Sequence, residues 1–451
     1  MAVPLDSGTD PAAEDVRRAR GRVAVARLRA GRGGLAARLR VFALLVGPGI
    51  LVFLGENDAP SMLSYAATGA GYGIGFFLPF VAATFALGFI VQEMAARVGA
   101  VTNHGHAELI FDRFGSFWGR FAMADLLVGN FLTLITEFIG VRAGLGFFGV
   151  PPAAAVGAAV VLVLFAAATA RYATWERITL GLALCNAVFV PVALLSHPDW
   201  GAVGRAMATW SPLPGGLRPD TVTLMVSNIG ATVTPWMLFF QQGAVADKGL
   251  EARDIGAARW DTAIGSAVAA LFGLAAIIAT APLFAHGISA QNWQAAQFAE
   301  AIEPYVGHAG AALFALGIFE AGAVAAIAIS TSSAYAFAEV MRVPHSLNAP
   351  LREGWVFYAV LAGSAGLAGL IVLAPGMPLQ EVVIIVNVVA VLAMPPALLF
   401  LLLIANDAEV MGPYRNAAGW NVAGVGVTAF LILVGLAYAA NVLFPSLLGG
   451  T

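Results

Sequence analysis

Two carboxylates and a proline interrupt the first long apolar segment of this chain. The segment begins near Val41, and Glu56, Asp58 and Pro60 fall near its middle. A charged side chain at the bilayer centre costs about 2.5–3.5 kcal/mol on the insertion scale, so it is found facing a cavity or a bound ion. Pro60 lacks a backbone N–H, and the carbonyl that it leaves unpaired needs a partner, which in a membrane can be an ion. The pattern predicts a membrane helix with a polar break.

A second apolar segment carries a similar interruption. It runs from Asn228 to Trp236, and Gly230 and Pro235 lie within it. Paired interruptions in corresponding halves of a chain mark the binding site of a transporter. The two breaks therefore predict a transport site between two halves of the fold.

Composition places the chain in a membrane. It is 60% hydrophobic and 11% charged, with a mean hydropathy of +0.84, whereas soluble domains are about 25% charged. Cys185 is the only cysteine, which excludes an internal disulfide and a thiolate metal cage. No small-residue cleavage signature accompanies the first apolar run, so we do not expect a removable signal peptide.

The hydropathy pattern predicts eleven membrane spans, of which the first and the sixth are broken. A membrane helix needs about 20 apolar residues, and each predicted span supplies that length. The spans are predicted at 41–71, 75–96, 117–148, 152–170, 177–196, 221–246, 260–285, 309–340, 354–373, 380–405 and 419–444.

Basic residues predict how these spans are oriented. Arginines are dense between Arg17 and Arg40, before the first span. Most later basic residues flank alternate loops, and the loop 286–308 contains no lysine or arginine. Because cytoplasmic loops carry the excess of lysine and arginine, the N-terminus is predicted to be cytoplasmic. The odd number of spans then places the C-terminus outside. The expected location is the plasma membrane, which is the inner membrane of a bacterium.

Opposite orientations of spans one to five and six to ten predict two inverted repeats. The predicted parts are a basic cytoplasmic segment (1–40), a first repeat (41–196), an outer loop (197–220), a second repeat (221–405), and a cytoplasmic loop with the eleventh span (406–451). The basic segment is interpreted as an anchor on anionic lipid, because no aromatic or groove-binding motif accompanies it. The lipid bilayer is therefore an expected partner. We expect no nucleic acid, and no obligate protein partner is evident.

Three stretches resemble the natural-resistance-associated macrophage protein (Nramp) family of divalent-metal transporters. They are 47–49 (Gly-Pro-Gly), 92–99 at the end of the second span, and 230–235 (Gly-Ala-Thr-Val-Thr-Pro), and the similarity covers most of the chain. The resemblance implies an all-α polytopic membrane protein with the LeuT-type fold. That fold has a 5+5 inverted repeat, with helices 1 and 6 broken, and here an eleventh transmembrane helix.

The resemblance also implies a metal site at the two breaks. Asp58 matches the family's metal-binding aspartate, and Ser61 stands where the family has an asparagine. The carbonyl of Ala231 matches a backbone ligand, and Asn387 matches a tenth-helix glutamine that faces the metal. Thr234 stands in place of the family's methionine.

The replacement of that methionine changes the expected metal. A thioether is a soft ligand that favours Mn²⁺ and later transition metals, whereas a hydroxyl oxygen is hard and suits Mg²⁺. Thr234 together with Trp236 resembles the Nramp-related magnesium transporter branch, which also has an acid two residues before its aspartate, here Glu56. The transported substrate is therefore expected to be Mg²⁺ or Mn²⁺, and no cofactor is expected.

Further polar residues are candidates for the ion pathway or for the surroundings of the metal. Asn57 lies between the two acids, and Gln241 and Gln242 follow the second break. The two glutamines either touch ion-bound water or pack as satisfied amides between helices.

Two titratable groups that the family uses for proton coupling are replaced. Trp236 stands at the position of a sixth-helix histidine and Leu134 at that of a third-helix aspartate, while Glu137 is retained. A tryptophan cannot titrate, and an isolated glutamate cannot relay a proton far. We therefore expect movement without strong proton coupling. Glu137 is interpreted either as part of the ion pathway or as a structural partner of Arg142.

His104, His106 and Glu108 superficially look like a metal cluster. Two histidines separated by one residue do not share a helix face, however. Packing within a cytoplasmic loop is therefore favoured over a role in metal uptake.

These observations favour a divalent-cation transporter that works by alternating access, with Mg²⁺ first and Mn²⁺ second. The alternative within the family is a proton-coupled Mn²⁺/Fe²⁺ symporter. An amino-acid symporter of the same fold is a further alternative, but Glu56 and Asp58 would repel a substrate carboxylate. The spans contain no nucleophile–base pair, phosphate loop or histidine-rich metal motif, so an enzyme is not expected.

Overall fold

The computed structural model describes residues 44–168, 171–288, 295–344, 346–376 and 379–443. In these ranges every regular element is a helix, and nine helical stretches are long and apolar enough to cross a membrane. The two other predicted spans correspond to the shorter apolar helix α8 and to the pair α3 and α4. The predicted basic segment 1–40 lies outside the described residues.

The first repeat contains five spans, and its last span changes to a 3₁₀ helix near the middle. The elements are α3 (Pro48–Glu56) with α4 (Ala59–Tyr72), α5 (Phe77–Thr102), α7 (Ser116–Gly146), α8 (Pro152–Ala168), and α9 (Tyr172–Ala183) continued by η1 (Leu184–Val188) and α10 (Phe189–Leu195).

The second repeat follows the same order, and α15 is kinked at Gly307. Its elements are α12 (Pro219–Gly230) with α13 (Pro235–Asp247), η2 (Ala252–Asp254) with α14 (Ile255–Ala285), α15 (Ala295–Met341), α16 (Trp355–Val372) and α17 (Leu379–Asn406). After it come α18 (Ala408–Met411), η3 (Gly412–Tyr414) and α19 (Ala418–Leu443).

Both predicted breaks are present, and a proline lies in the first turn of the helix after each of them. Only Asn57 and Asp58 separate α3 from α4, and Pro60 lies in the first turn of α4. Pro235 is the first residue of α13. Proline is tolerated in the first turn because the N–H that it lacks would have no partner within the helix. Each broken span is therefore two short helices joined by a non-helical segment.

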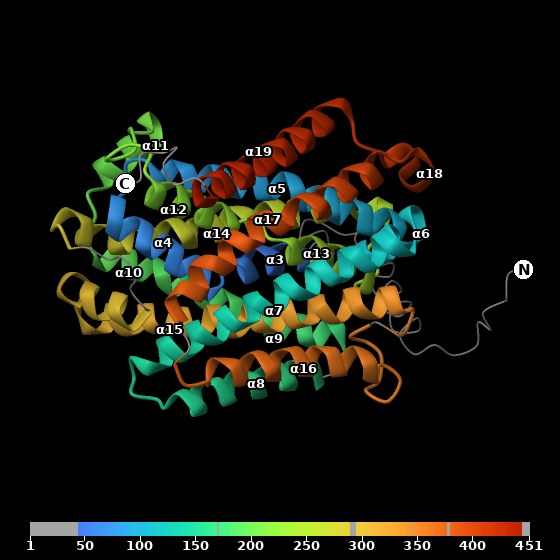
Figure 1. The fold of residues 1–451 in the computed structure, drawn as a ribbon, viewed down its shortest axis with the longest axis horizontal. Coiled ribbons are helices and arrows are strands. Elements are labelled where there is room, and N and C mark those ends of the chain that lie inside the picture. Colours follow the sequence, from blue (N-terminus) through green and yellow to red (C-terminus); the bar gives the residue numbers. More distant parts are fainter. Residues whose placement is uncertain (1–43, 169–170, 289–294, 345, 377–378, 444–451) are drawn as a thin grey trace, which may run out of the picture.

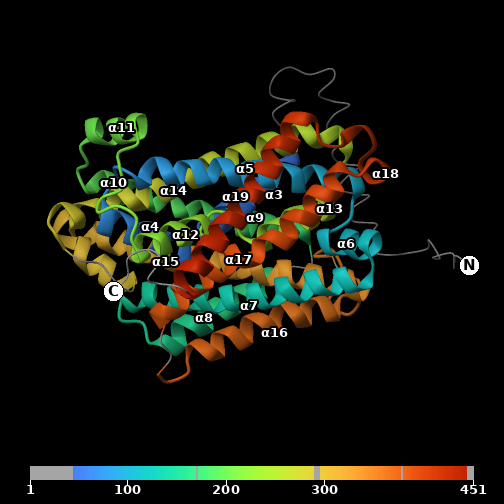
Figure 2. The ribbon, with the colours of Figure 1, turned by 45° about the horizontal axis from the view of Figure 1, so that its top comes forward.

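The two broken spans lie side by side with their halves in corresponding positions. In both views α4 and α12 lie toward the end of the molecule that carries α11, while α3 and α13 lie toward the end that carries α6 and α18 (Figure 1, Figure 2). The breaks consequently meet near the middle of the fold. The charge pattern predicts that the α11 end faces outside and that the α6 end faces the cytoplasm.

Close helix contacts hold the segments around the breaks. A Cβ atom on Gly230 would lie 2.3 Å from the carbonyl oxygen of Asn387, so glycine allows α12 to approach α17. A Cβ atom on Gly140 would lie 2.1 Å from the Cβ of Ala59, which places α7 against the first turn of α4. The third and tenth spans therefore border the breaks directly.

The beginning of α3 is fixed by polar contacts. The carboxylate of Asp261 in α14 accepts hydrogen bonds from the backbone N–H of Gly49 (2.6 Å) and Ile50 (3.2 Å). Lys248 Nζ, just after α13, donates to the carbonyl of Val46 (2.7 Å). The Asp261 contacts satisfy N–H groups that the first turn of a helix leaves unpaired, and all three contacts hold α3 against its neighbours.

Two helices lie where the sequence predicted loops. They are α6 (His106–Phe114) and α11 (Trp200–Thr209). Glu108 lies in the first turn of α6 and Arg113 in its last turn, so both charges suit the helix dipole. Asp199 accepts a hydrogen bond from the N–H of Gly201 (2.8 Å) and caps α11. Both helices are too short or too polar to have been found by a search for membrane spans.

Candidate ion site at the two helix breaks

One hydrogen bond joins the first break to the second. The hydroxyl of Thr234 donates to Glu56 Oε2 at 2.7 Å. Glu56 is the last residue of α3, and Thr234 is the residue that precedes α13. Both side chains are buried. The contact therefore brings together two predicted site residues that are 178 positions apart in the sequence.

Asp58 begins the second half of the first span. Its carboxylate accepts a hydrogen bond from the backbone N–H of Ser61 at 2.8 Å, so it caps α4. Glu137 in α7 lies beside it, because Glu137 Oε2 accepts the N–H of Ala59 at 3.1 Å and its carboxyl neighbours that of Asp58. The positive end of the α4 dipole favours both acids at this position.

Three buried oxygen atoms at the first break have no hydrogen-bond donor among the described residues. They are Glu56 Oε1, Asn57 Oδ1 and Glu137 Oε1. Asn57 is held in place by its amide, which donates to the carbonyl of Ala269 at 2.9 Å. A buried acceptor without a donor is costly, and a cation is the partner that satisfies several such oxygens at once.

The predicted backbone ligand and the predicted tenth-helix ligand lie on the α4–α12 side of the break. The carbonyl of Ala231 accepts a hydrogen bond from the Tyr65 hydroxyl at 2.7 Å. The amide of Asn387 donates to Ser227 Oγ at 3.3 Å, and that hydroxyl also contacts Ser64 at 3.0 Å. A carbonyl oxygen has a second lone pair, so the Tyr65 contact leaves Ala231 able to bind an ion.

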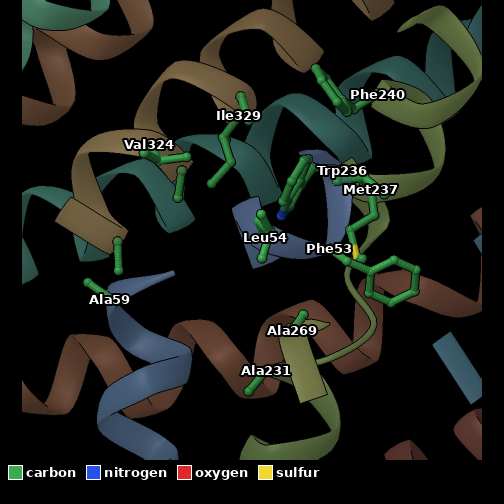
Figure 3. Close-up of a cluster of buried hydrophobic side chains, with 14 of the residues drawn as sticks. Phe53, Leu54, Ala59, Ala231, Trp236, Met237, Phe240, Ala269, Val324 and Ile329 are labelled. Atoms are coloured by element: carbon green, nitrogen blue, oxygen red, sulfur yellow. The ribbon is translucent and has the colours of Figure 1, made fainter. Parts of the chain in front are cut away.

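Trp236 forms an apolar wall on the other side of the break. A Cβ atom on Gly55 would lie 3.2 Å from the Trp236 ring, and the ring makes an edge contact with Phe240. Figure 3 shows Trp236 within the buried cluster that also contains Leu54 and Met237. The indole nitrogen is also near Glu56. The ring is bulky and cannot titrate, and the resemblance matches it to a histidine of the family.

The two glutamines after the second break lie apart from the acids. Gln241 Nε2 approaches Thr262 Oγ1 in α14 at 3.4 Å, and Gln241 Oε1 has no donor within the described ranges. Gln242 lies two turns beyond Thr234, where Nε2 donates to the carbonyl of His104 at 3.0 Å. Gln242 packs between helices, whereas Gln241 retains an oxygen that could accept from water.

The alternative pairing of Glu137 with Arg142 is wrong. The guanidinium of Arg142 donates to the carbonyl of Val372 at 3.0 Å, at the end of α16. Glu137 lies more than one helical turn earlier and faces the start of α4, where it accepts the N–H of Ala59. Glu137 therefore lies beside the first break, and its recorded contact is with Ala59 and not with Arg142.

The two loop histidines have different environments. His104 is exposed and pairs with Glu108 at 2.9 Å, and this hydrogen bond raises the pKa of His104. His106 is buried at the start of α6, with Nδ1 3.1 Å from Gln242 Oε1 and Nε2 3.2 Å from the carbonyl of Ala397. In the part of the chain that the structure describes, no group of three or more histidine, cysteine or acidic side chains has metal-binding geometry.

Burial lowers the pKa of His106 to about 4, although its two hydrogen bonds act in the opposite direction. The unfolded chain therefore binds a proton that the folded chain excludes between about pH 6.5 and pH 4, so stability falls as the pH falls through this window. At pH 5 the loss is about 2 kcal/mol. We expect the melting temperature in detergent to drop less between pH 7 and pH 5 in His106→Asn than in the native chain. An equal drop in melting temperature in His106→Asn and the native chain would contradict a neutral, buried His106.

Several residues at the site were not predicted from the sequence. Tyr65 and Ser227 contact the predicted ligands Ala231 and Asn387, Ser64 contacts Ser227, and Asn228 is buried nearby. The available signal was the recurrence of hydroxyl residues Ser61, Ser64 and Thr68 along one face of the first span, at helical spacing.

Similarity to solved structures supports the same architecture. A manganese transporter from Eremococcus coleocola, solved in complex with an aromatic bis-isothiourea compound, has a TM-score of 0.71 at 21% identity, covering 91% of this chain and 90% of that one. MhsT in complex with L-phenylalanine has a TM-score of 0.55 at 15% identity, with 87% and 97% covered. The predicted LeuT-type fold with two inverted repeats is therefore confirmed.

Sequence comparisons extend over the same region. The divalent metal cation transporter MntH of Aeromonas hydrophila subsp. hydrophila is 26% identical over 408 residues, covering 86% of this chain and 95% of the relative. The protein of that name in Yersinia pestis is 27% identical over 406 residues, with 87% and 93% covered. The family model described as natural resistance-associated macrophage protein-like matches residues 49–441. A match over most of the chain, together with the two paired breaks, shows that this protein belongs to that family.

Proposed function

We propose that this chain carries divalent metal cations across the membrane by alternating access, with Mg²⁺ preferred and Mn²⁺ second. The observation that carries the proposal is the 2.7 Å hydrogen bond between Glu56 and Thr234, which joins the two breaks beside Asp58. Relatives named as divalent metal cation transporters support the class of substrate. The proposed orientation has the N-terminus in the cytoplasm.

The donor set favours a hard cation. The proposed ligands are oxygens from Asp58, Glu56, Thr234, the Ala231 carbonyl and Asn387, and Ser61 lies beside Asp58. Carboxylate, hydroxyl and carbonyl oxygens suit Mg²⁺, whereas a thioether would favour softer ions. Asn57 and Glu137 hold further oxygens close to these ligands. The site therefore lacks the soft ligand that would select against Mg²⁺.

The selectivity of the site is tested at Thr234. We expect Thr234→Met to raise the apparent affinity for Mn²⁺ or Cd²⁺ relative to Mg²⁺, because the thioether gains most from a polarizable ion. Thr234→Val is the matched control, since it removes the hydroxyl that bonds Glu56 without adding sulfur. The inhibition of Mg²⁺ uptake by Mn²⁺ or Cd²⁺ measures the ratio of the apparent affinity for that metal to the apparent affinity for Mg²⁺. Identical ratios in the Met and Val variants would remove Thr234 from the site.

A proton-coupled Mn²⁺/Fe²⁺ symporter is the second candidate, and Glu137 is the observation that favours it. Its carboxyl lies next to Asp58, so a proton on one acid would respond to metal on the other. An amino-acid symporter is less favoured, because three carboxyl groups at the break would repel a substrate carboxylate. Uptake of Mg²⁺, Mn²⁺ and Ca²⁺ into proteoliposomes that contain a pH dye distinguishes these functions.

A further inference from the structure

The eighth span packs against the 3₁₀ segment of the fifth span. A Cβ atom on Gly317 in α15 would lie 2.8 Å from Val188 Cγ2 in η1, and one on Gly310 would lie 3.4 Å from Leu195 Cδ1 in α10. Moving forward along α15 therefore corresponds to moving back along the fifth span. The two helices run antiparallel, and glycine lets them approach closely.

This register places Glu320 beside the first half of η1. Glu320 lies one turn beyond Gly317 in α15, and Cys185 and Asn186 lie about one turn before Val188. The Glu320 carboxyl is close enough to the Cys185 thiol to interact with it electrostatically, which agrees with the register. An acid of the eighth span and an amide of the fifth span are thus on adjoining turns.

Glu320 is a buried acid that faces away from the first break. A Cβ atom on Gly322 would lie 2.7 Å from the carbonyl oxygen of Glu137 and 3.3 Å from the Cβ of Ala59. Residues two apart on a helix do not face the same neighbour, so Glu320 points to another side of α15. Its side chain is buried, and neither carboxylate oxygen has a hydrogen-bond donor among the described residues. An unpaired carboxyl at this depth is costly and marks a functional site.

Asn186 supplies a third unpaired oxygen. Its side chain is fully buried, and its amide donates to the carbonyl of Leu54 in α3 at 3.4 Å. Asn186 Oδ1 has no donor within the described ranges. Figure 3 shows Leu54 in the same buried cluster as Val324, which follows Glu320 by one turn. The 3₁₀ hydrogen bonds of η1 have poorer geometry than those of an α-helix, so its backbone carbonyls can also serve an ion.

A cation accounts for these oxygens better than a proton does. A proton satisfies one oxygen of a carboxylate, whereas a metal ion can contact both of them and an amide oxygen as well. A monovalent ion balances the single negative charge of Glu320. Mg²⁺ would leave a positive charge uncompensated in the membrane, and it gives up its water reluctantly.

We infer that Glu320 and Asn186 form a second cation site, between α15 and η1, which binds a monovalent alkali ion such as Na⁺. The inference goes beyond the proposed function and does not depend on it. The bound ion neutralises Glu320 and ties the eighth span to the fifth. The bond from Asn186 to the Leu54 carbonyl connects the site to the first span.

The first test measures the melting temperature of the detergent-purified chain while NaCl replaces choline chloride at constant ionic strength. A ligand that binds only the folded state raises the melting temperature, so the native chain should show a saturable rise. Glu320→Gln keeps the volume, removes the charge and should show no rise. Asn186→Leu should raise the half-saturating Na⁺ concentration about tenfold, as expected for the loss of one interaction with a charged group.

Asp125→Asn is the matched control for Glu320→Gln. Asp125 is a partly buried acid of α7, about three helical turns before Glu137. This variant should respond to Na⁺ like the native chain. The absence of a saturable rise in the native chain, or an equal rise in Glu320→Gln, would overturn the inference.

The second test uses Cys185 as a reporter at the site. Cys185 is exposed and is the only cysteine of the chain, so a bimane fluorophore can be attached without other substitutions. Na⁺ should change its emission with the same half-saturating concentration as the melting temperature, and Glu320→Gln should abolish the change. An emission that ignores Na⁺ while the melting temperature responds would place the ion elsewhere and overturn the site.

Asp58→Ala separates this site from the candidate ion site at the breaks. The variant should keep the Na⁺ response of the native chain, because Asp58 supplies no oxygen to the second site. Loss of the response in Asp58→Ala would place Na⁺ at the breaks and overturn the inference. Native Mg²⁺ uptake in Asp58→Ala would instead contradict the proposed function and leave the second site standing.

Discussion

Replacing Asp58 with alanine is expected to reduce Mg²⁺ uptake to the level of protein-free liposomes while leaving the chain folded. The carboxylate lies at the first break and supplies charge that no neutral ligand can replace. Its loss also removes the cap of α4, which costs about 0.5–2 kcal/mol. Removal of a buried carboxylate offsets part of that cost. A Mg²⁺ indicator inside the liposomes measures uptake, and the melting temperature in detergent reports folding.

Two variants separate charge from helix capping. Asp58→Asn keeps an oxygen that can accept the N–H of Ser61, and we expect it to fail in transport as well. Asp199→Ala deletes a cap of the same kind at α11, far from the breaks, and should transport normally. Native uptake by Asp58→Ala would contradict the whole assignment of the ion site.

Glu56→Gln should show a smaller effect than the change at Asp58. A glutamine oxygen can still accept from the Thr234 hydroxyl, so the link between the breaks survives while one charge is lost. Uptake should therefore fall without disappearing, in the same liposome measurement. Complete loss of uptake would mean that the Glu56 carboxylate is as essential to ion binding as the Asp58 carboxylate.

The spans and their breaks could be predicted because they depend on local composition. Acids within an apolar run, followed by proline, specify the end of α3 and the start of α4 from the residues alone. The same holds for Gly230 and Pro235 at the second break. Helices α6 and α11 lack the long apolar stretch that identifies a span, so they were predicted as loops.

The contacts within the site depend on distant residues and could not be derived from a single sequence. Glu56 and Thr234 are 178 residues apart, and Glu137 meets the start of α4 across 78 residues. Sequence reasoning placed Glu137 on its helix but left open which neighbour it faces. It also gave no reason to pair Tyr65 with the Ala231 carbonyl, because that contact requires the two repeats to pack together.

Metal uptake is expected to proceed without proton movement. Trp236, which the resemblance matches to a family histidine, packs against Phe240 and Gly55 and cannot titrate. Leu134, which the resemblance matches to a third-helix acid of the family, is buried. Two positive charges gain about 4.6 kcal/mol per 100 mV of membrane potential, which drives uptake without a second ion. In liposomes clamped at a negative internal potential, external Mg²⁺ should fill the lumen with no more acidification than in protein-free controls.

Acidification that rises with the metal concentration would instead show that coupling survives. Glu137 would then be the residue responsible, because its carboxyl lies beside Asp58 and could exchange a proton when metal arrives. Glu137→Gln distinguishes the two cases, since glutamine can still accept the N–H of Ala59 but cannot carry a proton. In a coupled transporter this variant would lose metal-dependent acidification. In an uncoupled one, Mg²⁺ uptake by Glu137→Gln should retain the voltage dependence of the native chain, because the transported charge is that of the metal alone.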